Sequence, residues 1–96
     1  MILSLESLTL NGEPIDFSRA SLDWKREGLI AHWTGFVWGG GTQGLMDAPD
    51  LRLEAMTKNG RDVTGHALVT NLSVLSGDFA LQGTGPLLVD GEEPLR

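Results

Sequence analysis

The stretch GHALVTNLSVLSGDFALQGTGPLL, residues 65–88, decides the fold of this chain. It contains two apolar runs separated by a Ser-Gly-Asp turn at residues 76–78, and it ends in the Gly-Thr-Gly-Pro sequence of residues 83–86. Residues 63–75 are the strongest strand signal, because their apolar and β-branched side chains divide between two faces with a period of two. The stretch therefore predicts two β-strands joined by a tight turn.

The rest of the chain fits a small β-rich domain. Its 96 residues are enough for one domain with one modest core. Thirteen glycines are roughly double the usual share of about 7%, which indicates tight turns between short strands. We expect a single β-domain over residues 1–89 and a flexible acidic tail over residues 90–96.

The first thirty residues predict further strands. Leucines alternate along residues 3–10, but their phase changes at Glu6-Ser7, which predicts a β-bulge. Asn11-Gly12 favours a tight turn, since both residues tolerate positive φ angles. Residues 21–26 alternate in the manner of a half-exposed strand, and Glu27-Gly28 is the expected hairpin turn after it.

Residues 29–38 are apolar on both faces of the strand that they predict. Trp33 and Trp38 fall on opposite faces of a regular strand, so at most one of them can point into the core. We therefore expect the strand to be covered twice, by its own core and by a second element, for which a partner subunit is one option. The sequence leaves open which face is covered by which.

Residues 50–60 are compatible with two structures. An aspartate at the first position and the spacing of Glu54 and Lys58 favour a short helix. Leucines at alternate positions, followed by Asn59-Gly60, favour a strand and a hairpin instead, and we prefer the hairpin. With strands spaced by about 8 to 12 residues, the predicted fold is a small antiparallel β-sandwich or barrel, with this one short helix as an alternative.

The charge excludes some partners. Seven basic and thirteen acidic residues give a net charge of −6, which opposes tight binding of nucleic acid or anionic lipid. The N-terminal residues lack the basic, apolar layout of a secretory signal, and no apolar run has the roughly 20 residues of a membrane helix. We expect a protein in the cytoplasm, without a membrane partner.

No motif for catalysis or metal binding is present in the sequence. His32 and His66 belong to no zinc motif, no serine lies in a Gly-x-Ser-x-Gly elbow, and the acidic residues lack calcium-loop spacing. A small hydrolase or isomerase would require both histidines to converge on one carboxylate. We therefore predict no enzyme activity, no cofactor and no metal.

Aromatic residues and a glycine-rich loop are the candidates for an interface. Three aromatic side chains lie on the doubly apolar strand, and the loop that follows it can become ordered on assembly. The candidate interface residues are Trp33, Phe36, Trp38, Gly39, Gly40, Gly41, Thr42, Gln43 and Gly44.

Residues 59–87, NGRDVTGHALVTNLSVLSGDFALQGTGPL, resemble the C-terminal half of the major tail-tube proteins of siphophages. The matching features are the hairpin turn at Asn59-Gly60, the glycine-led strand of residues 65–73 and the final strand that closes in Gly-Thr-Gly. The resemblance covers about a third of the chain, and the first half has no clear match. It implies a β-sandwich or barrel whose copies form hexameric rings, stacked into a tube with a DNA-repelling acidic lumen.

Two functions follow as hypotheses. The first is a structural subunit of a phage or prophage tail, either the tube or a related component, whose partners are copies of itself or other tail proteins. Such a protein is made in the cytoplasm of the host and ends in the virion tail. The alternative is a small β-barrel module that binds a peptide or carbohydrate through exposed aromatic side chains and an edge strand.

Overall fold

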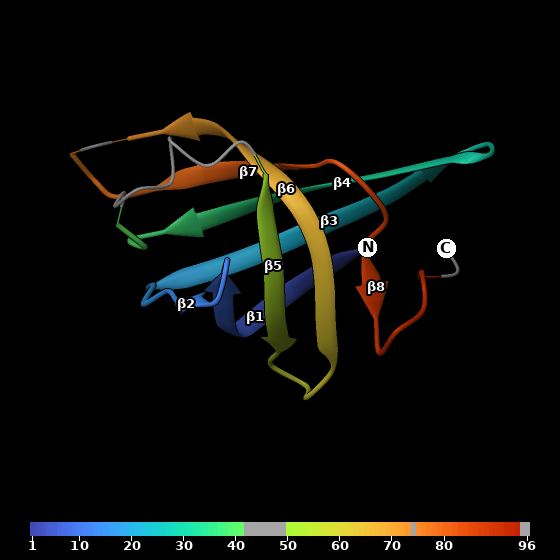
Figure 1. Ribbon diagram of the computed structural model, residues 1–96, viewed down its shortest axis with the longest axis horizontal. Coiled ribbons are helices and arrows are strands. Elements are labelled where there is room, and N and C mark those ends of the chain that lie inside the picture. Colours follow the sequence, from blue (N-terminus) through green and yellow to red (C-terminus); the bar gives the residue numbers. More distant parts are fainter. Residues whose placement is uncertain (42–49, 74, 95–96) are drawn as a thin grey trace.

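The protein is an all-β barrel (Figure 1). The computed structural model describes residues 1–41, 50–73 and 75–94, and it contains no helix within these ranges. The strands are β1 (Ile2–Leu10), β2 (Glu13–Pro14), β3 (Arg19–Glu27), β4 (Ile30–Trp38), β5 (Leu51–Thr57), β6 (Asp62–Leu72), β7 (Phe79–Gly83) and β8 (Leu88–Val89).

Six antiparallel strands close into a barrel in the order β1-β3-β4-β7-β6-β5, because β5 pairs with β1 as well as with β6. The two short strands are additions to this ring: β2 pairs with the end of β1, and β8 pairs with the start of β6. The all-β class is therefore confirmed, and of the two predicted architectures the barrel is the one adopted. Closure pairs strand edges that an open sheet would expose.

The predicted hairpin at residues 50–60 is confirmed. β5 pairs with β6 from Leu51 opposite Ala67 to Met56 opposite Asp62, and the turn between the strands contains Gly60 at φ 87°. Alternate side chains of β5 point into the barrel, which explains why the strand is preferred over a helix. A helix here would leave β1 and β6 each with one unpaired edge, and the barrel would not close.

The predicted bulge and turn in the first strand are also present. The pairing of β1 with β5 shifts between Leu5 and Ser7, so that Leu5 and Leu8 both lie inside the barrel although they are three residues apart. Asn11 and Gly12 follow with φ of 51° and 83°, as a two-residue hairpin turn requires. Pro14 lies on the two-residue strand β2 at the edge, where its missing N–H costs no ladder bond.

The barrel interior is the hydrophobic core. Its largest fully buried side chain is Trp33 of β4, and all six barrel strands contribute buried aliphatic side chains to it. The buried hydrophobic residues are Leu5, Leu8, Leu10, Ala20, Leu22, Trp24, Trp33, Val37, Leu51, Leu53, Val63, Ala67, Phe79, Leu81 and Leu87.

Glycines in β6 and at the end of β7 make room for the Trp33 indole. A methyl group at Gly83 would overlap with the indole Nε1, and one at Gly65 would lie 2.9 Å from Cζ2. The indole N–H donates a hydrogen bond to the carbonyl of Gly85 at 2.9 Å. The Gly-Thr-Gly sequence at residues 83–85 therefore seats a buried tryptophan, and its polar N–H is satisfied.

The segment after β7 returns along β6 and carries β8. The N–H of Thr84 donates to the His66 carbonyl at 2.9 Å, and Leu87 is fully buried. Asp90, assigned from the sequence to the flexible tail, donates its N–H to the Asp62 carbonyl at 2.7 Å and accepts the Asp62 N–H through its carboxylate at 3.0 Å. The hydrogen-bonded chain thus continues past residue 90, while residues 95–96 lie outside the described ranges.

The hairpin of β3 and β4 extends beyond the barrel, along the longest dimension of the molecule (Figure 1). β4 pairs with β7 only from Thr34 to Val37, and β3 pairs with β1 only from Ser21 to Asp23. The remaining two-stranded ribbon, residues 25–32, is called the arm below. Its turn consists of Gly28 and Leu29, one residue later than the Glu27-Gly28 turn that the sequence predicts.

Candidate functional site

The tip of the arm carries the most exposed pair of adjacent aliphatic side chains among the residues described. Leu29 is 94% exposed and Ile30 is 70% exposed. They are consecutive residues at the end of a ribbon whose outer edges pair with no other strand in the described ranges. Adjacent exposed aliphatic side chains beside open strand edges are typical of an interaction site.

The base of the arm is anchored in the barrel, whereas its tip is exposed. Trp24 and Trp33 are cross-strand neighbours at the base, and both are buried in the core. Met1 and Trp24 exchange two backbone hydrogen bonds of 2.8 Å, which adds β1 to the same anchor. At the tip, Gly28 has φ of 63°, so the chain reverses without strain. The arm therefore projects from the barrel and has no hydrophobic core of its own.

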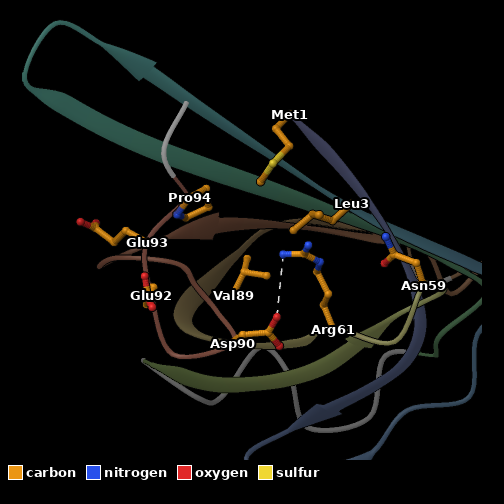
Figure 2. A pocket seen from close by; sticks show the side chains of 9 residues that line it. All are labelled: Met1, Leu3, Asn59, Arg61, Val89, Asp90, Glu92, Glu93 and Pro94. Carbon is orange, nitrogen blue, oxygen red and sulfur yellow. Dashed lines mark ion pairs between the residues drawn. The ribbon is translucent and has the colours of Figure 1, made fainter.

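A hollow of about 590 Å³ lies between the start of β1, the β5–β6 turn and β8 (Figure 2). It is called the β8 hollow below. Figure 2 shows Met1, Leu3 and Val89 gathered around it, with Arg61 paired to Asp90. Its lining residues are Met1, Leu3, Asn59, Arg61, Val89, Asp90, Glu92, Glu93 and Pro94.

The charges around the β8 hollow are mainly acidic. The Arg61 guanidinium lies 3.8 Å from the Asp90 carboxylate, and more than half of each side chain is exposed. Glu92 and Glu93 are exposed, and neither makes an ion pair within the described part of the chain. The hollow thus combines an apolar surface with uncompensated negative charge at its rim.

A smaller groove of about 440 Å³ runs between one face of the arm and the end of the barrel. The arm lines this groove with Arg26, Leu29 and Ala31. The barrel end lines it with Pro86, Glu93 and Pro94, of which Glu93 and Pro94 also line the β8 hollow. The three arm residues are exposed, so the barrel core does not cover this face of the arm. The uncovered apolar surface of the tip therefore continues from Leu29 to Ala31.

The aromatic interface candidates divide between the inside and the outside of the barrel. Trp33 is 1% exposed and belongs to the core, so its ring is not on the surface of the monomer. Phe36 and Trp38 are half-buried on the outer face, with ring centroids 4.4 Å apart. The Arg19 guanidinium lies 4.1 Å from the Trp38 centroid and covers one face of that ring.

The first glycines of the predicted loop have structural contacts. The N–H of Gly39 donates to the Asp78 carboxylate at 2.7 Å, and the N–H of Gly41 donates to the Gly77 carbonyl at 3.0 Å. These bonds tie the end of β4 to the turn before β7, and Gly40 packs against the core residue Phe79. The candidates Thr42, Gln43 and Gly44 lie outside the described residues.

The two histidines have different carboxylate partners. His66 Nδ1 lies 2.8 Å from Asp50 Oδ2, and the Thr84 hydroxyl donates to the other oxygen of Asp50 at 3.3 Å. His32 Nδ1 lies 3.9 Å from the Glu27 carboxylate on the arm. Neither histidine lines the hollow or the groove described above. In residues 1–41, 50–73 and 75–94 no group of three or more His, Asp or Glu is placed to bind a metal.

The sequence contained a signal for the arm that alternation does not detect. Leu29 and Ile30 directly follow a glycine at a hairpin turn, where solvent exposure is highest and polar residues are usual. Two aliphatic residues at such a tip indicate an external contact. The β8 hollow had no comparable signal, since residues 1–3, 59–61 and 89–94 meet only in the folded chain.

Comparison with known proteins identifies no relative: no family model, no curated protein and no solved structure matches the chain. The resemblance to tail-tube proteins therefore stays a prediction from the sequence. Among the residues whose structure is described, no helix has the length and apolar character needed to cross a lipid bilayer.

Proposed function

We propose that this protein is a non-enzymatic structural subunit that assembles with copies of itself, as a component of a phage or prophage tail. The observation that carries the proposal is the arm, which presents Leu29 and Ile30 to solvent at 94% and 70% exposure. Burying an aliphatic side chain of this size stabilises a contact by about 1.5–3 kcal/mol. The monomer makes no use of this free energy, whereas an assembly would.

The shape of the molecule suits an assembly. The arm leaves the barrel at one end (Figure 1), so a contact between the arm and another part of a second copy joins different surfaces. Such heterologous contacts build rings when the rotation closes and filaments when it does not. In a ring, a net charge of −6 would help to keep nucleic acid from adhering to the inner wall.

The test is the oligomeric state of the purified chain and of an arm variant. Sedimentation velocity and light scattering over a concentration series should show association of the wild type. Leu29→Ser/Ile30→Ser should remain monomeric at concentrations at which the wild type associates. The matched control is Leu68→Ser/Met56→Ser, which removes two other exposed apolar side chains from β6 and β5 and should associate normally. A wild type that is strictly monomeric at the highest concentration would refute the proposal.

A binding module is the second candidate, and the outer pair of Phe36 and Trp38 favours it. Aromatic rings on a sheet surface can stack on a sugar or hold a peptide. Arg19 already covers one face of Trp38, which leaves less ring surface for a ligand. Loss of binding to a peptide or glycan array on Trp38→Ala, in a protein that stays monomeric, would favour this function over assembly.

A further inference from the structure

We propose that the β8 hollow of one copy receives the arm tip of the next copy. This inference rests on the proposed function and names the surface that the arm contacts. The proposed contact places Leu29 and Ile30 of the arm against Met1, Leu3 and Val89 of the neighbouring hollow.

The size and polarity of the two surfaces match. The hollow has a volume of about 590 Å³, within the range of about 300–1,000 Å³ in which proteins bind compact ligands, and two aliphatic side chains fit this space. Leu3 and Val89 are half-buried and Met1 is 46% exposed, so apolar surface is available inside the hollow. The arm supplies the most exposed adjacent aliphatic pair in the described ranges.

The charges of the two surfaces are partly complementary, since the arm carries two exposed cations and one exposed carboxylate, Glu27, while the hollow has three carboxylates beside Arg61 and the N-terminal ammonium. Glu92 and Glu93 at the rim of the hollow are exposed and make no ion pair within the ranges described. On the arm, Lys25 and Arg26 follow directly after the buried base and are exposed. Lys25 lies 3.7 Å from Asp23, and Arg26 Nε donates to the Gly28 carbonyl at 3.2 Å, so both cations are held close to the path of the arm. Opposite charges around an apolar centre favour this pairing and its orientation.

The proposed contact allows two kinds of assembly. Each copy has one arm and one hollow, and Glu93 and Pro94 of the hollow also line the groove beside the arm, so the two surfaces are neighbours. Two copies that exchange arms reciprocally close as a two-fold dimer, whereas copies that each bind two neighbours form a ring or a filament. Sedimentation velocity distinguishes the dimer from the larger assemblies.

Charge reversal tests the pairing. Glu92→Lys/Glu93→Lys and Lys25→Glu/Arg26→Glu should each weaken self-association, by about tenfold for two exposed pairs, and an equimolar mixture of the two variants should associate more tightly than either alone. Added sodium chloride should weaken the wild type in the same direction. The matched control is Glu6→Lys/Glu54→Lys, which makes the same change of charge on other exposed positions of β1 and β5.

Disulfide cross-linking locates the contact independently. The chain contains no cysteine, so only the introduced thiols can form a disulfide. Leu29→Cys and Glu92→Cys are prepared as separate proteins, mixed and oxidised. A disulfide between the two variants should form in preference to either homodimer. Leu29→Cys mixed with Thr70→Cys, an exposed position on β6, is the control and should cross-link less.

The outcomes separate this inference from the proposed function. Rescue in the charge-reversed mixture, together with the disulfide between the Leu29→Cys and Glu92→Cys variants, supports the inference. If arm variants lose association while hollow variants associate normally and Glu92→Cys forms no preferred cross-link, the arm binds elsewhere: the inference is overturned and the assembly function stands. If Leu29→Ser/Ile30→Ser associates as the wild type does, the arm is not the contact and the inference is overturned, whereas the assembly function is overturned by a wild type that stays monomeric. A hollow that instead binds a peptide or small molecule, with no effect on association, also overturns the inference.

Discussion

The barrel half and the arm half of one hairpin have opposite environments. In the barrel, β3 and β4 place Trp24 and Trp33 next to each other in the core, at 3% and 1% exposure. Five residues after Trp24 on the same ribbon, Leu29 is 94% exposed. The hydrogen-bonded ladder of β3 and β4 is continuous, so the difference in exposure does not come from local strand propensity. It arises because other strands cover the ribbon in the barrel and none in the described ranges covers it at the arm tip. A strand signal therefore predicts where a strand forms, but not whether the rest of the chain covers it.

The comparison separates residues that maintain the fold from residues that are available for function. Removing a buried side chain from the barrel half should destabilise the protein, because a cavity remains. Removing an exposed side chain from the arm should leave stability unchanged and affect only association. The variants below test this division, beginning with the largest expected effect.

Trp33→Ala should cause the greatest loss of stability. It removes the largest fully buried side chain, and the Gly85 carbonyl loses the indole N–H that donates to it. We expect a loss of about 3–5 kcal/mol, which is a large part of the about 5–15 kcal/mol that stabilises a typical domain. Urea denaturation followed by far-UV circular dichroism measures it. A loss below about 1 kcal/mol would show that Trp33 is not an anchor of the barrel.

Gly83→Ala should destabilise the protein by about 1–3 kcal/mol, because the added methyl group overlaps with the Trp33 indole. Gly85→Ala is the matched control, since nothing lies within 4 Å of the position of its new methyl group. The control should change the free energy of unfolding by less than about 0.5 kcal/mol. Equal effects of the two substitutions on the urea midpoint would contradict the close packing of Gly83 against the Trp33 indole.

Leu29→Ser/Ile30→Ser should leave the free energy of unfolding within about 0.5 kcal/mol of the wild type, measured on the monomer at low concentration. The same variant should weaken self-association at least about tenfold, since two aliphatic side chains lose a partner. Sedimentation velocity and urea denaturation on one preparation give both values. A clear loss of monomer stability would mean that the arm tip contributes to the fold, and the division between the two halves would fail.

Arg61→Gln should have the smallest effect. Its pair with Asp90 spans 3.8 Å and is more than half exposed, so a change of about 0.5 kcal/mol or less is expected in urea denaturation. β8 is held instead by backbone pairing with Val63 and Thr64. A loss above about 1 kcal/mol would show that this ion pair, and not the backbone, fixes the wall of the β8 hollow.

Local patterns in the sequence predicted much of the barrel. The phase change at Glu6-Ser7 predicted the bulge, and Asn59-Gly60 predicted the hairpin, because bulges and turns depend on neighbouring residues. The turn of the arm lies one residue later than the sequence predicts, since Gly28 suits either register. The sequence does not decide whether Trp33 or Trp38 faces inward, because a period of two defines two faces without saying which one is covered.

Features that depend on distant residues were not predicted. Closure of the barrel through β1 and β5 joins residues far apart in the chain, as in the pair Leu10 and Leu53. The fit of Gly83 to the Trp33 indole and the walls of the β8 hollow have the same origin. The candidates Thr42, Gln43 and Gly44 stay predictions, because the structure does not describe them.

The pairing of β1 with β5 also affects the order of folding. β1 emerges first during synthesis, and its partner β3 follows soon after, as in the pair Ser4 and Ser21. The ladder that includes Leu5 and Thr57 can form only after residue 57 has been made. Such distant pairing is slow compared with local hairpin formation. Until then the edge of β1 that faces β5 has no partner, and an unpaired strand edge favours aggregation.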